Sequence, residues 1–208
     1  MVIELDGISK AYGGTKVLQN VTARFDASSR VVCIKGESGA GKTTLLSIIG
    51  GIESPDSGTV KINGCCAKKP KDFAFIRYIP CDGGLLDAVP VERNILFGFN
   101  NKEEHWEERV KEVLLNLGIS HTYGKYPFEL SSGEYKRVQI AKMVFNFGSA
   151  SAYLIDEPTA NLDKESARLV RKAIKECSEK ARDKLFIIAT HDSELLKMAD
   201  KVTEITGC

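Results

Sequence analysis

The sequence predicts an α/β fold with a mostly parallel sheet, an antiparallel β subdomain and an inserted helical subdomain. Strands alternate with helices over much of the chain, which is typical of a parallel sheet. Val31–Lys35 (VVCIK) is a short apolar run that suits a buried strand, and a Gly-rich loop and a helix follow it directly. The middle of the chain instead has helical periodicity. A length of 208 residues fits one domain with a sizeable core.

The first part of the chain reads mainly as strands. Val2–Leu5 and Val17–Phe25 are expected to pair in the antiparallel sheet, joined by the turn-forming Gly13 and Gly14. After the strand Val31–Lys35, a helix is expected to begin near Lys42, with the sequence LLSIIGG in its body. Two further strands are predicted at Val60–Ile62 and Ile76–Ile79.

The middle of the chain is predicted to form the helical subdomain. In Glu103–Leu117 apolar residues recur at spacings of three and four, which indicates an amphipathic helix. Glu134–Phe147 reads as another helix. We therefore expect residues 82–147 to form the helical subdomain, inserted into a core made of residues 1–81 and 148–208. The predicted elements after the insertion are the strand Ala152–Ile155, a helix at Lys164–Arg182, the strand Leu185–Ala189 and a helix at Ser193–Ala199.

Composition excludes several classes of protein. The 29 basic and 28 acidic residues leave a net charge of +1, which gives no case for a nucleic-acid partner. No apolar run approaches the roughly eighteen residues that a membrane span needs, and the N-terminus does not read as a signal peptide. Six cysteines and three histidines are scattered without metal-ligand spacing. We expect a cytosolic protein with reduced cysteines, so any membrane role needs a separate membrane subunit.

The loop GESGAGKT fits the phosphate-loop pattern G-x-x-x-x-G-K-[ST], in the strand–loop–helix context that the pattern requires. Its backbone N–H groups can wrap phosphate oxygens at a helix N-terminus, Lys42 can supply charge to the β- and γ-phosphates, and the Thr43 hydroxyl can ligate Mg²⁺. Alone, the motif could be a chance Gly-rich turn, or could indicate only nucleoside-triphosphate binding. The nucleotide-binding residues predicted here are Gly36, Glu37, Ser38, Gly39, Ala40, Gly41, Lys42, Thr43 and Thr44.

Two carboxylates follow an apolar strand. Tyr153–Asp156 (YLID) places Asp156 at the carboxyl end of the strand, where α/β sheets bind ligands, so Asp156 is a candidate Mg²⁺ ligand. Glu157 comes next and is a candidate catalytic residue. The alternative is a solvated turn before Pro158.

Three motifs in this order resemble the nucleotide-binding domain of an ABC (ATP-binding cassette) ATPase. They are the phosphate loop, LSSGEYKR at Leu130–Arg137, and YLIDEPTANLD at Tyr153–Asp163. The resemblance runs from Glu4 to about Ile205, so the core is expected to be a P-loop NTPase core. It implies that Glu157 orients or deprotonates the attacking water, and that His191 contacts the γ-phosphate. A histidine after a strand could instead be structural.

The resemblance also implies a nucleotide site shared between two chains. Tyr12 would stack on adenine, although a plain turn tyrosine is the alternative. Ser131, Ser132 and Gly133 would face the γ-phosphate bound by a second ATPase subunit in a head-to-tail dimer with two ATP molecules; a purely structural helix cap is the alternative. Asp163 resembles the family residue that links the two sites.

The sequence departs from the family at two places. The usual signature is LSGGQ or LSGGE, whereas here Ser132 replaces the first glycine and Glu134 is fifth. Cys81, in YIPCD, stands where the family has a glutamine that contacts Mg²⁺ and senses the transmembrane partner. A thiol is a poor ligand for Mg²⁺, so metal contact and coupling through this loop are in doubt. Because Lys42, Asp156, Glu157 and His191 are present, hydrolysis is still expected.

The expected function is that of the ATPase subunit of an ABC transporter, with ATP and Mg²⁺, on the cytoplasmic face of a membrane. It would drive membrane-spanning transporter subunits through a groove near Cys81 and the loop Asp82–Asn94. GGIESPDSG, LSSGE and THDSELLKMAD resemble the branch that serves lipoprotein release and export of macrolides or antimicrobial peptides, so export is expected. One alternative is a non-transport ABC ATPase acting on ribosomes or DNA, but such proteins usually have two cassettes or a long coiled coil. Another is a P-loop kinase, which does not explain LSSGE.

Overall fold

A computed structural model describes residues 1–98, 105–181 and 183–205. The chain divides into two compact units. The first contains Met1–Pro80, Ala150–Glu157 and the described residues from Ala181 onward, and the second contains Cys81–Ser149 and Pro158–Lys180. No helix among the described residues is long and apolar enough to cross a membrane.

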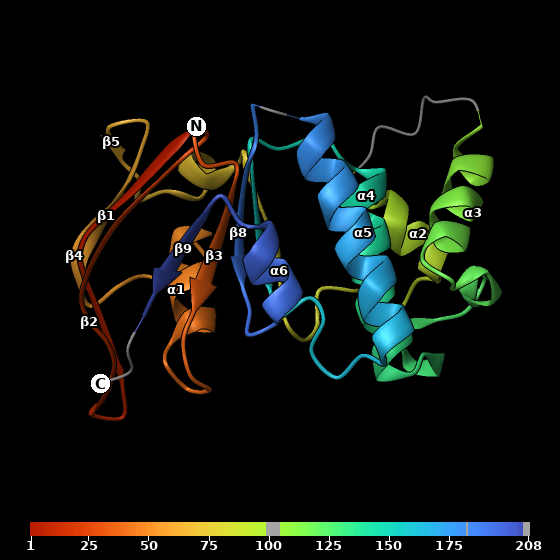
Figure 1. The fold of residues 1–208 in the computed structure, drawn as a ribbon, viewed down its shortest axis with the longest axis horizontal. Helices are drawn as coiled ribbons and strands as arrows, with labels where there is room; N and C mark the ends of the chain where they lie inside the picture. Colours follow the sequence, from red (N-terminus) through yellow and green to blue (C-terminus); the bar gives the residue numbers. More distant parts are fainter. Residues whose placement is uncertain (99–104, 182, 206–208) are drawn as a thin grey trace. The chain divides into compact units, whose positions relative to one another are not determined.

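The first unit contains an antiparallel sheet with the strand order β2-β1-β4-β5 (Figure 1). β1 (Val2–Tyr12) and β2 (Thr15–Asp26) form the predicted hairpin and are both longer than predicted. Gly13 and Gly14 make its turn with φ of 55° and 85°, a region of backbone space that glycine enters without strain. The other two strands are β4 (Ser57–Ile62) and β5 (Cys65–Cys66).

The first unit also contains a parallel sheet with the strand order β6-β7-β8-β3-β9. Its inner strands are continuous apolar runs because both faces are covered, and every residue of β7 and β8 is buried. The sequence did not predict β9, whose polar residues KVTE suit an edge strand. The five strands are β3 (Val31–Lys35), β6 (Ile76–Ile79), β7 (Ala152–Asp156), β8 (Leu185–Ala189) and β9 (Lys201–Glu204).

Helix α1 (Lys42–Ile49) contacts strands of both sheets, namely β2 on one side and β7 and β8 on the other. Its buried residues Leu45, Leu46, Ile48 and Ile49 join the core that the two sheets share. The short helix α6 (Ser193–Met198) is capped by Asp192, whose carboxylate accepts the N–H of Glu194 at 2.8 Å. The packing of α1 against both sheets fixes the loop that connects β3 to α1, where the phosphate motif lies.

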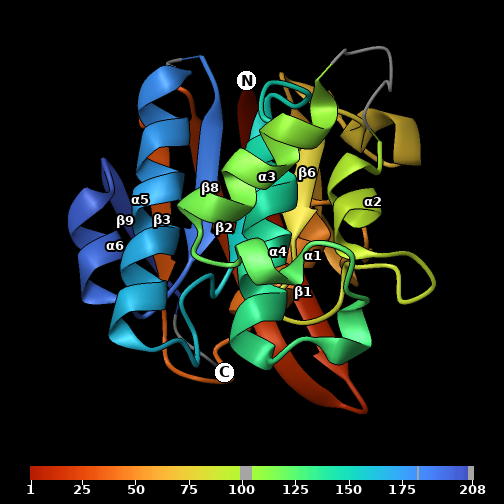
Figure 2. The ribbon, with the colours of Figure 1, turned by 90° about the vertical axis from the view of Figure 1, so that its right-hand side faces the viewer.

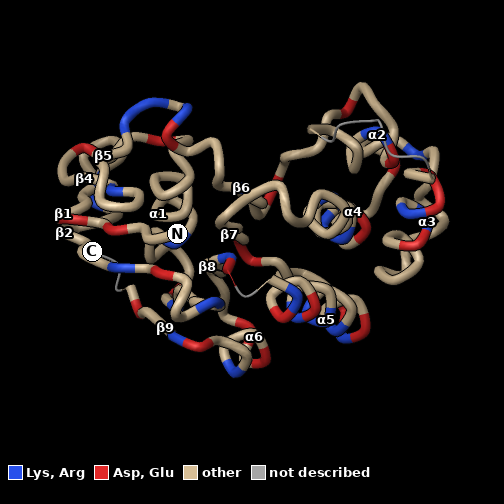
Figure 3. The backbone as a smooth tube through the Cα atoms, turned by 90° about the horizontal axis from the view of Figure 1, so that it is seen from above, with Lys and Arg blue, Asp and Glu red and all other residues tan. Residues whose placement is uncertain are grey.

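The second unit is helical. Its central helix is α4, which contacts α2, α3 and α5 (Figures 2 and 3). α3 follows the predicted periodicity, although Glu103 and Glu104 of the predicted helix lie outside the described residues, as does Arg182 of the predicted last turn of α5. The six-residue α2 was not predicted. The helices are α2 (Val91–Leu96), α3 (Trp106–Asn116), α4 (Ser132–Phe145) and α5 (Lys164–Lys180).

The unit boundary differs from the predicted insertion of residues 82–147. The second unit also includes Pro158–Lys180, which the sequence analysis placed in the core. The physical reason is the contact between α5 and α4. α5 is amphipathic and buries Val170 and Ile174, so its apolar face groups it with the other long helices.

Candidate nucleotide-binding and hydrolysis site

The phosphate-binding loop connects β3 to α1. Gly39 and Gly41 have φ of 82° and 86°, and a Cβ atom on Gly41 would lie 2.7 Å from Leu18 Cδ2 and 2.9 Å from the Val17 carbonyl oxygen. Only glycine therefore fits at position 41 without displacing the β-hairpin. Among the described residues no side chain caps the N-terminus of α1. Its first N–H groups and its positive dipole end thus suit an anion.

Lys42 is held inside this loop. Its side chain is only 9% exposed, and its ammonium donates to the carbonyl oxygens of Gly36 at 2.8 Å and Glu37 at 3.0 Å. An ammonium has three donors, so these two bonds leave one for a ligand. The charge is placed before any ligand binds, which suits phosphate recognition.

Glu157 lies between Lys42 and His191. One carboxylate oxygen is 3.7 Å from Lys42 Nζ, and the other is 3.0 Å from His191 Nδ1. The His191 side chain is 74% exposed, whereas that of Glu157 is 15% exposed. The structure therefore brings together the three residues that were predicted to be catalytic, with the largely buried carboxylate of Glu157 between the Lys42 ammonium and the accessible His191 ring.

The backbone of Glu157 is unusual. Its φ is 45°, in the left-handed region that non-glycine residues seldom occupy, and its N–H donates to the Ala189 carbonyl at 2.9 Å. Such a conformation costs on the order of 1–3 kcal/mol and persists where the surroundings fix it. No sequence pattern predicted this strain. It turns the chain at the end of β7 and directs the Glu157 side chain toward Lys42.

Thr43 and Asp156 carry oxygen atoms of the kind that Mg²⁺ prefers. Asp156 is fully buried at the carboxyl end of β7, and the Tyr78 hydroxyl lies 3.4 Å from its Oδ2 atom. Thr43 is exposed in the first turn of α1. The described residues contain no group of three or more His, Cys, Asp or Glu side chains that could hold a metal. Mg²⁺ does not require one, because it commonly takes one or two protein oxygens with phosphates and waters.

Tyr12 lies at the end of β1, and 46% of its surface is exposed, as stacking on a base requires. Its hydroxyl donates to Glu53, and Lys10 Nζ lies 5.5 Å from the ring centroid. Burial of the hydroxyl, with a further contribution from Glu53, raises the pKa of Tyr12. The sequence did not reveal Glu53, which comes near Tyr12 only through folding, and which fixes the orientation of the ring.

In the second unit, Ser131 is the N-cap of α4. The Ser131 hydroxyl accepts the Glu134 N–H at 3.3 Å, and the Glu134 carboxylate accepts the N–H of Ser131 at 2.8 Å and its hydroxyl at 2.9 Å. This is a capping box. A hydrogen bond from His121 is the largest cause that lowers the pKa of Glu134 to about 2, and the Ser131 N–H adds to it. Ser132 and Gly133 form the first turn of the helix.

Asp163 caps α5 in a similar way. It accepts the N–H groups of Glu165 and Ser166 at 3.0 Å and the Ser166 hydroxyl at 2.6 Å. The Ser166 hydroxyl is the largest cause that lowers the pKa of the Asp163 carboxyl. Within this chain the carboxylate therefore has a structural role, which the sequence analysis did not assign to it.

The loop that contains Cys81 is attached to α4. The buried ammonium of Lys136 donates to the Cys81 carbonyl oxygen, and Gln139 Nε2 donates to the Gly83 carbonyl oxygen at 2.5 Å. Neither Lys136 nor Gln139 was predicted from the sequence. A polar pair three residues apart on an otherwise apolar helix face is the signal that could have identified them.

Comparisons with known proteins identify the family. A sequence model of the ABC transporter family matches residues 18–160. The lipoprotein-releasing system ATP-binding protein LolD of Bacteroides thetaiotaomicron is 32% identical over 98% of this chain and 96% of its own length. The Fe(3+) ions import ATP-binding protein FbpC of Pseudomonas fluorescens is 33% identical over 96% of this chain, which spans only 57% of that relative.

The fold resembles solved structures at lower sequence identity. The dimeric ATP-binding cassette MJ0796, in a post-hydrolysis state bound to ADP and Pi, matches with a TM-score of 0.82 and 23% identity. The match covers 98% of this chain and 94% of that one. It confirms the predicted α/β fold with its parallel and antiparallel sheets.

Proposed function

This chain is an ATP-binding ATPase domain of the ABC transporter family, and we propose that it hydrolyses ATP to power transport through separate membrane-spanning subunits. Its place would be on the cytoplasmic face of the membrane. The observation that carries the proposal is the convergence of Lys42, Glu157 and His191 at the phosphate-binding loop. Lys42 would supply positive charge for phosphate, Glu157 is the candidate base, and His191 would orient that base.

Each residue has a distinct task in the proposed reaction. Lys42 neutralises charge on the β- and γ-phosphates from a position fixed by two backbone carbonyls. The Glu157 carboxylate orients the attacking water and accepts its proton, and His191 holds that carboxylate in place. Thr43 and Asp156 would hold Mg²⁺, which neutralises phosphate charge when bound. Tyr12 would stack on the adenine.

The proposed working form is a head-to-tail dimer with a second ATPase subunit, either another copy or a different cassette. The helix N-terminus at Ser131, Ser132 and Gly133 would face the nucleotide bound by the partner. Asp163, which caps α5, would hold the loop that links the two sites. The dimeric state of the MJ0796 cassette supports this arrangement.

We propose export as the direction of transport. The relatives are named for both lipoprotein release and iron import, so their names alone do not choose a direction. The choice rests on the motifs GGIESPDSG, LSSGE and THDSELLKMAD, which resemble those of the lipoprotein-release and macrolide-export branch.

Glu157→Gln tests the proposal, because it keeps size and hydrogen bonding but removes the base. ATP should still bind, hydrolysis should fall by about 10²–10⁴-fold, and a nucleotide-bound dimer should accumulate in light scattering with Mg-ATP. The control is Glu165→Gln, an exposed carboxylate in the first turn of α5, which should hydrolyse ATP like the wild type. A Glu157→Gln protein that stays monomeric at saturating ATP counts against the dimer, and unchanged hydrolysis counts against the catalytic role.

A further inference from the structure

An exposed group of positive charges lies outside the candidate site, in residues 63–77 of the first unit. This stretch contains four basic residues and one acidic residue, whereas the whole chain has a net charge of only +1. All four basic side chains are exposed. Lys68, Lys69 and Lys71 lie between β5 and β6, whereas Arg77 lies in β6 itself; Figure 3 shows basic residues in blue beside β5. We call Lys68, Lys69, Lys71 and the nearby Phe75 the basic face.

The lysines of the basic face differ in their ion pairing from other lysines of the described chain. Elsewhere in the chain Lys10, Lys61, Lys172, Lys175 and Lys197 each lie within 4.0 Å of an Asp or Glu oxygen. Within the described part of the chain, no such ion pair involves the three lysines of the basic face, although Asp72 interacts electrostatically with Lys71 and Lys69. The one nearby acid, Asp72, uses its Oδ2 atom to accept the backbone N–H groups of Lys68 at 2.9 Å and Lys69 at 2.8 Å.

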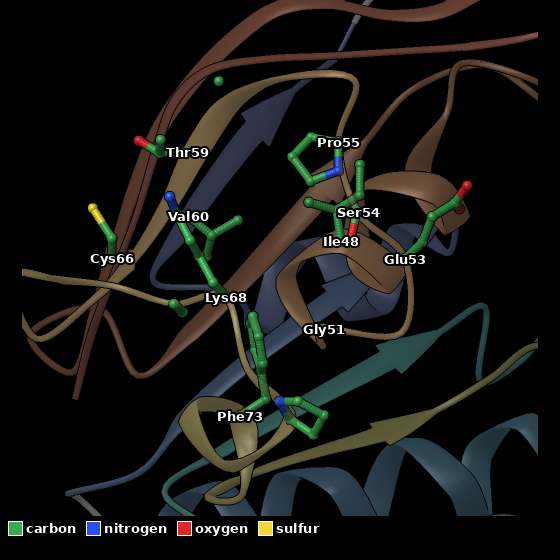
Figure 4. Close-up of a pocket in the computed structure, with 13 residues that line it drawn as sticks. Ile48, Gly51, Glu53, Ser54, Pro55, Thr59, Val60, Cys66, Lys68 and Phe73 are labelled. Atoms are coloured by element: carbon green, nitrogen blue, oxygen red, sulfur yellow. The ribbon is translucent and has the colours of Figure 1, made fainter.

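The backbone beneath these lysines is fixed. Pro70–Phe73 forms a 3-10 turn that Asp72 caps from within. Phe73 packs on Gly51, where an added Cβ would lie 2.3 Å from the ring. Lys68 and Phe73 help to line a hollow of about 480 Å³ next to this turn (Figure 4). The positive charges are therefore presented from a rigid base, with flexible side chains above it.

Phe75 adds an apolar group to this face. It is 62% exposed, and an exposed aromatic ring among lysines is typical of segments that lie at a membrane interface. Lysine is a strongly hydrated point charge without the fixed fork that arginine offers to a single carboxylate. Three lysines and a phenylalanine therefore suit a continuous layer of negative headgroups better than one acidic side chain of a protein.

We propose that the basic face binds the surface of a membrane that contains anionic lipid headgroups. This goes beyond the proposed ATPase function, because it gives the chain a membrane contact of its own besides the transporter subunits. Each lysine near an anionic surface contributes roughly a factor of five in affinity, so three together supply on the order of 100-fold at low salt. The attraction decays within a Debye length of about 8 Å at physiological ionic strength.

Vesicle co-sedimentation tests the proposal with the full chain, using phosphatidylcholine vesicles with and without phosphatidylglycerol. The wild type should bind only the anionic vesicles, and high salt should release it. The variant Lys68→Ala/Lys69→Ala/Lys71→Ala should bind on the order of 100-fold more weakly. The matched control Lys172→Ala/Lys175→Ala/Lys197→Ala removes the same charge from paired lysines and should lose much less affinity. Phe75→Ser should weaken binding several-fold.

Equal binding to both kinds of vesicle, or equal losses in the two triple variants, would overturn the proposal. So would a triple variant that binds vesicles normally but fails to co-purify with membrane subunits in detergent, since the basic face would then dock a protein. ATPase activity is measured in parallel. Normal hydrolysis without vesicle binding rejects the membrane contact alone and leaves the proposed function intact.

Discussion

The substitution Glu134→Gln measures how much the negative charge of Glu134 stabilises the N-terminus of α4. The carboxylate accepts two hydrogen bonds from Ser131 and one from the His121 ring. Glutamine keeps the size of the side chain and one acceptor oxygen, but it cannot carry the negative charge that His121 and the helix N-terminus favour. The substitution therefore isolates the electrostatic part of the capping box.

The magnitude follows from the pKa of Glu134, which is lowered from 4.5 to about 2, first by His121 and then by the Ser131 N–H. A pKa shift of this size corresponds to roughly 3 kcal/mol of folding free energy. The His121 side chain is 56% exposed, and solvent weakens such pairs, so we expect about 1–2 kcal/mol. A carboxyl group whose pKa is lower in the folded state stabilises the fold above about pH 4.5. That stability is lost as the pH falls toward 2.

Urea unfolding followed by circular dichroism at a series of pH values provides the assay. Glu134→Gln should be less stable than the wild type above pH 4.5 by about 1–2 kcal/mol, and the difference should shrink as the pH is lowered. Glu165→Gln is the control, because its carboxylate pairs with Arg168 at the surface and should contribute about 0.5 kcal/mol or less. A difference between Glu134→Gln and the wild type that stays constant with pH would refute the reasoning.

Three further substitutions test other parts of the molecule. Lys42→Ala should lower both ATP affinity and turnover, the latter by 10²-fold or more, and wild-type ATPase activity would reject the nucleotide site. Cys81→Gln should lower the Mg²⁺ concentration needed for half-maximal ATPase activity without changing metal-free nucleotide affinity; coincident Mg²⁺ titrations would contradict this. Lys136→Met should speed hydrogen exchange in the Cys81 loop by removing a charged hydrogen bond worth about 1.5–3 kcal/mol, whereas unchanged exchange would show that the bond does not hold the loop.

Sequence patterns identified the buried strands well because the signal for such a strand lies in the strand's own residues. The strands Val31–Lys35, Ile76–Ile79 and Leu185–Ala189 have the predicted bounds, since each has apolar residues at its buried positions. β9 escaped prediction because an edge strand can be polar, and α2 because six residues are too few to show a helical period. The grouping of α5 with α4 depends on contacts between distant segments.

The candidate site was predictable to a similar extent. The motifs identified Lys42, Glu157 and His191, and the structure brings their charged groups together. The left-handed backbone of Glu157 and the bond from Tyr12 to Glu53 could not be predicted. Both arise where chain segments meet in space, and neither has a signature in the residues next to it.

Helix α4 connects two features that the sequence presents as separate. Its first turn carries the Ser131 cap, and one and two turns further on Lys136 and Gln139 donate hydrogen bonds to the carbonyl oxygens of Cys81 and Gly83. A helix moves as a stiff rod, so a displacement of its first turn must also displace these carbonyls. This link uses backbone oxygens and is independent of the side chain at position 81. We therefore expect Cys81→Gln to change only the Mg²⁺ dependence of hydrolysis and Lys136→Met to change only the attachment of the Cys81 loop, so the two effects should be separable.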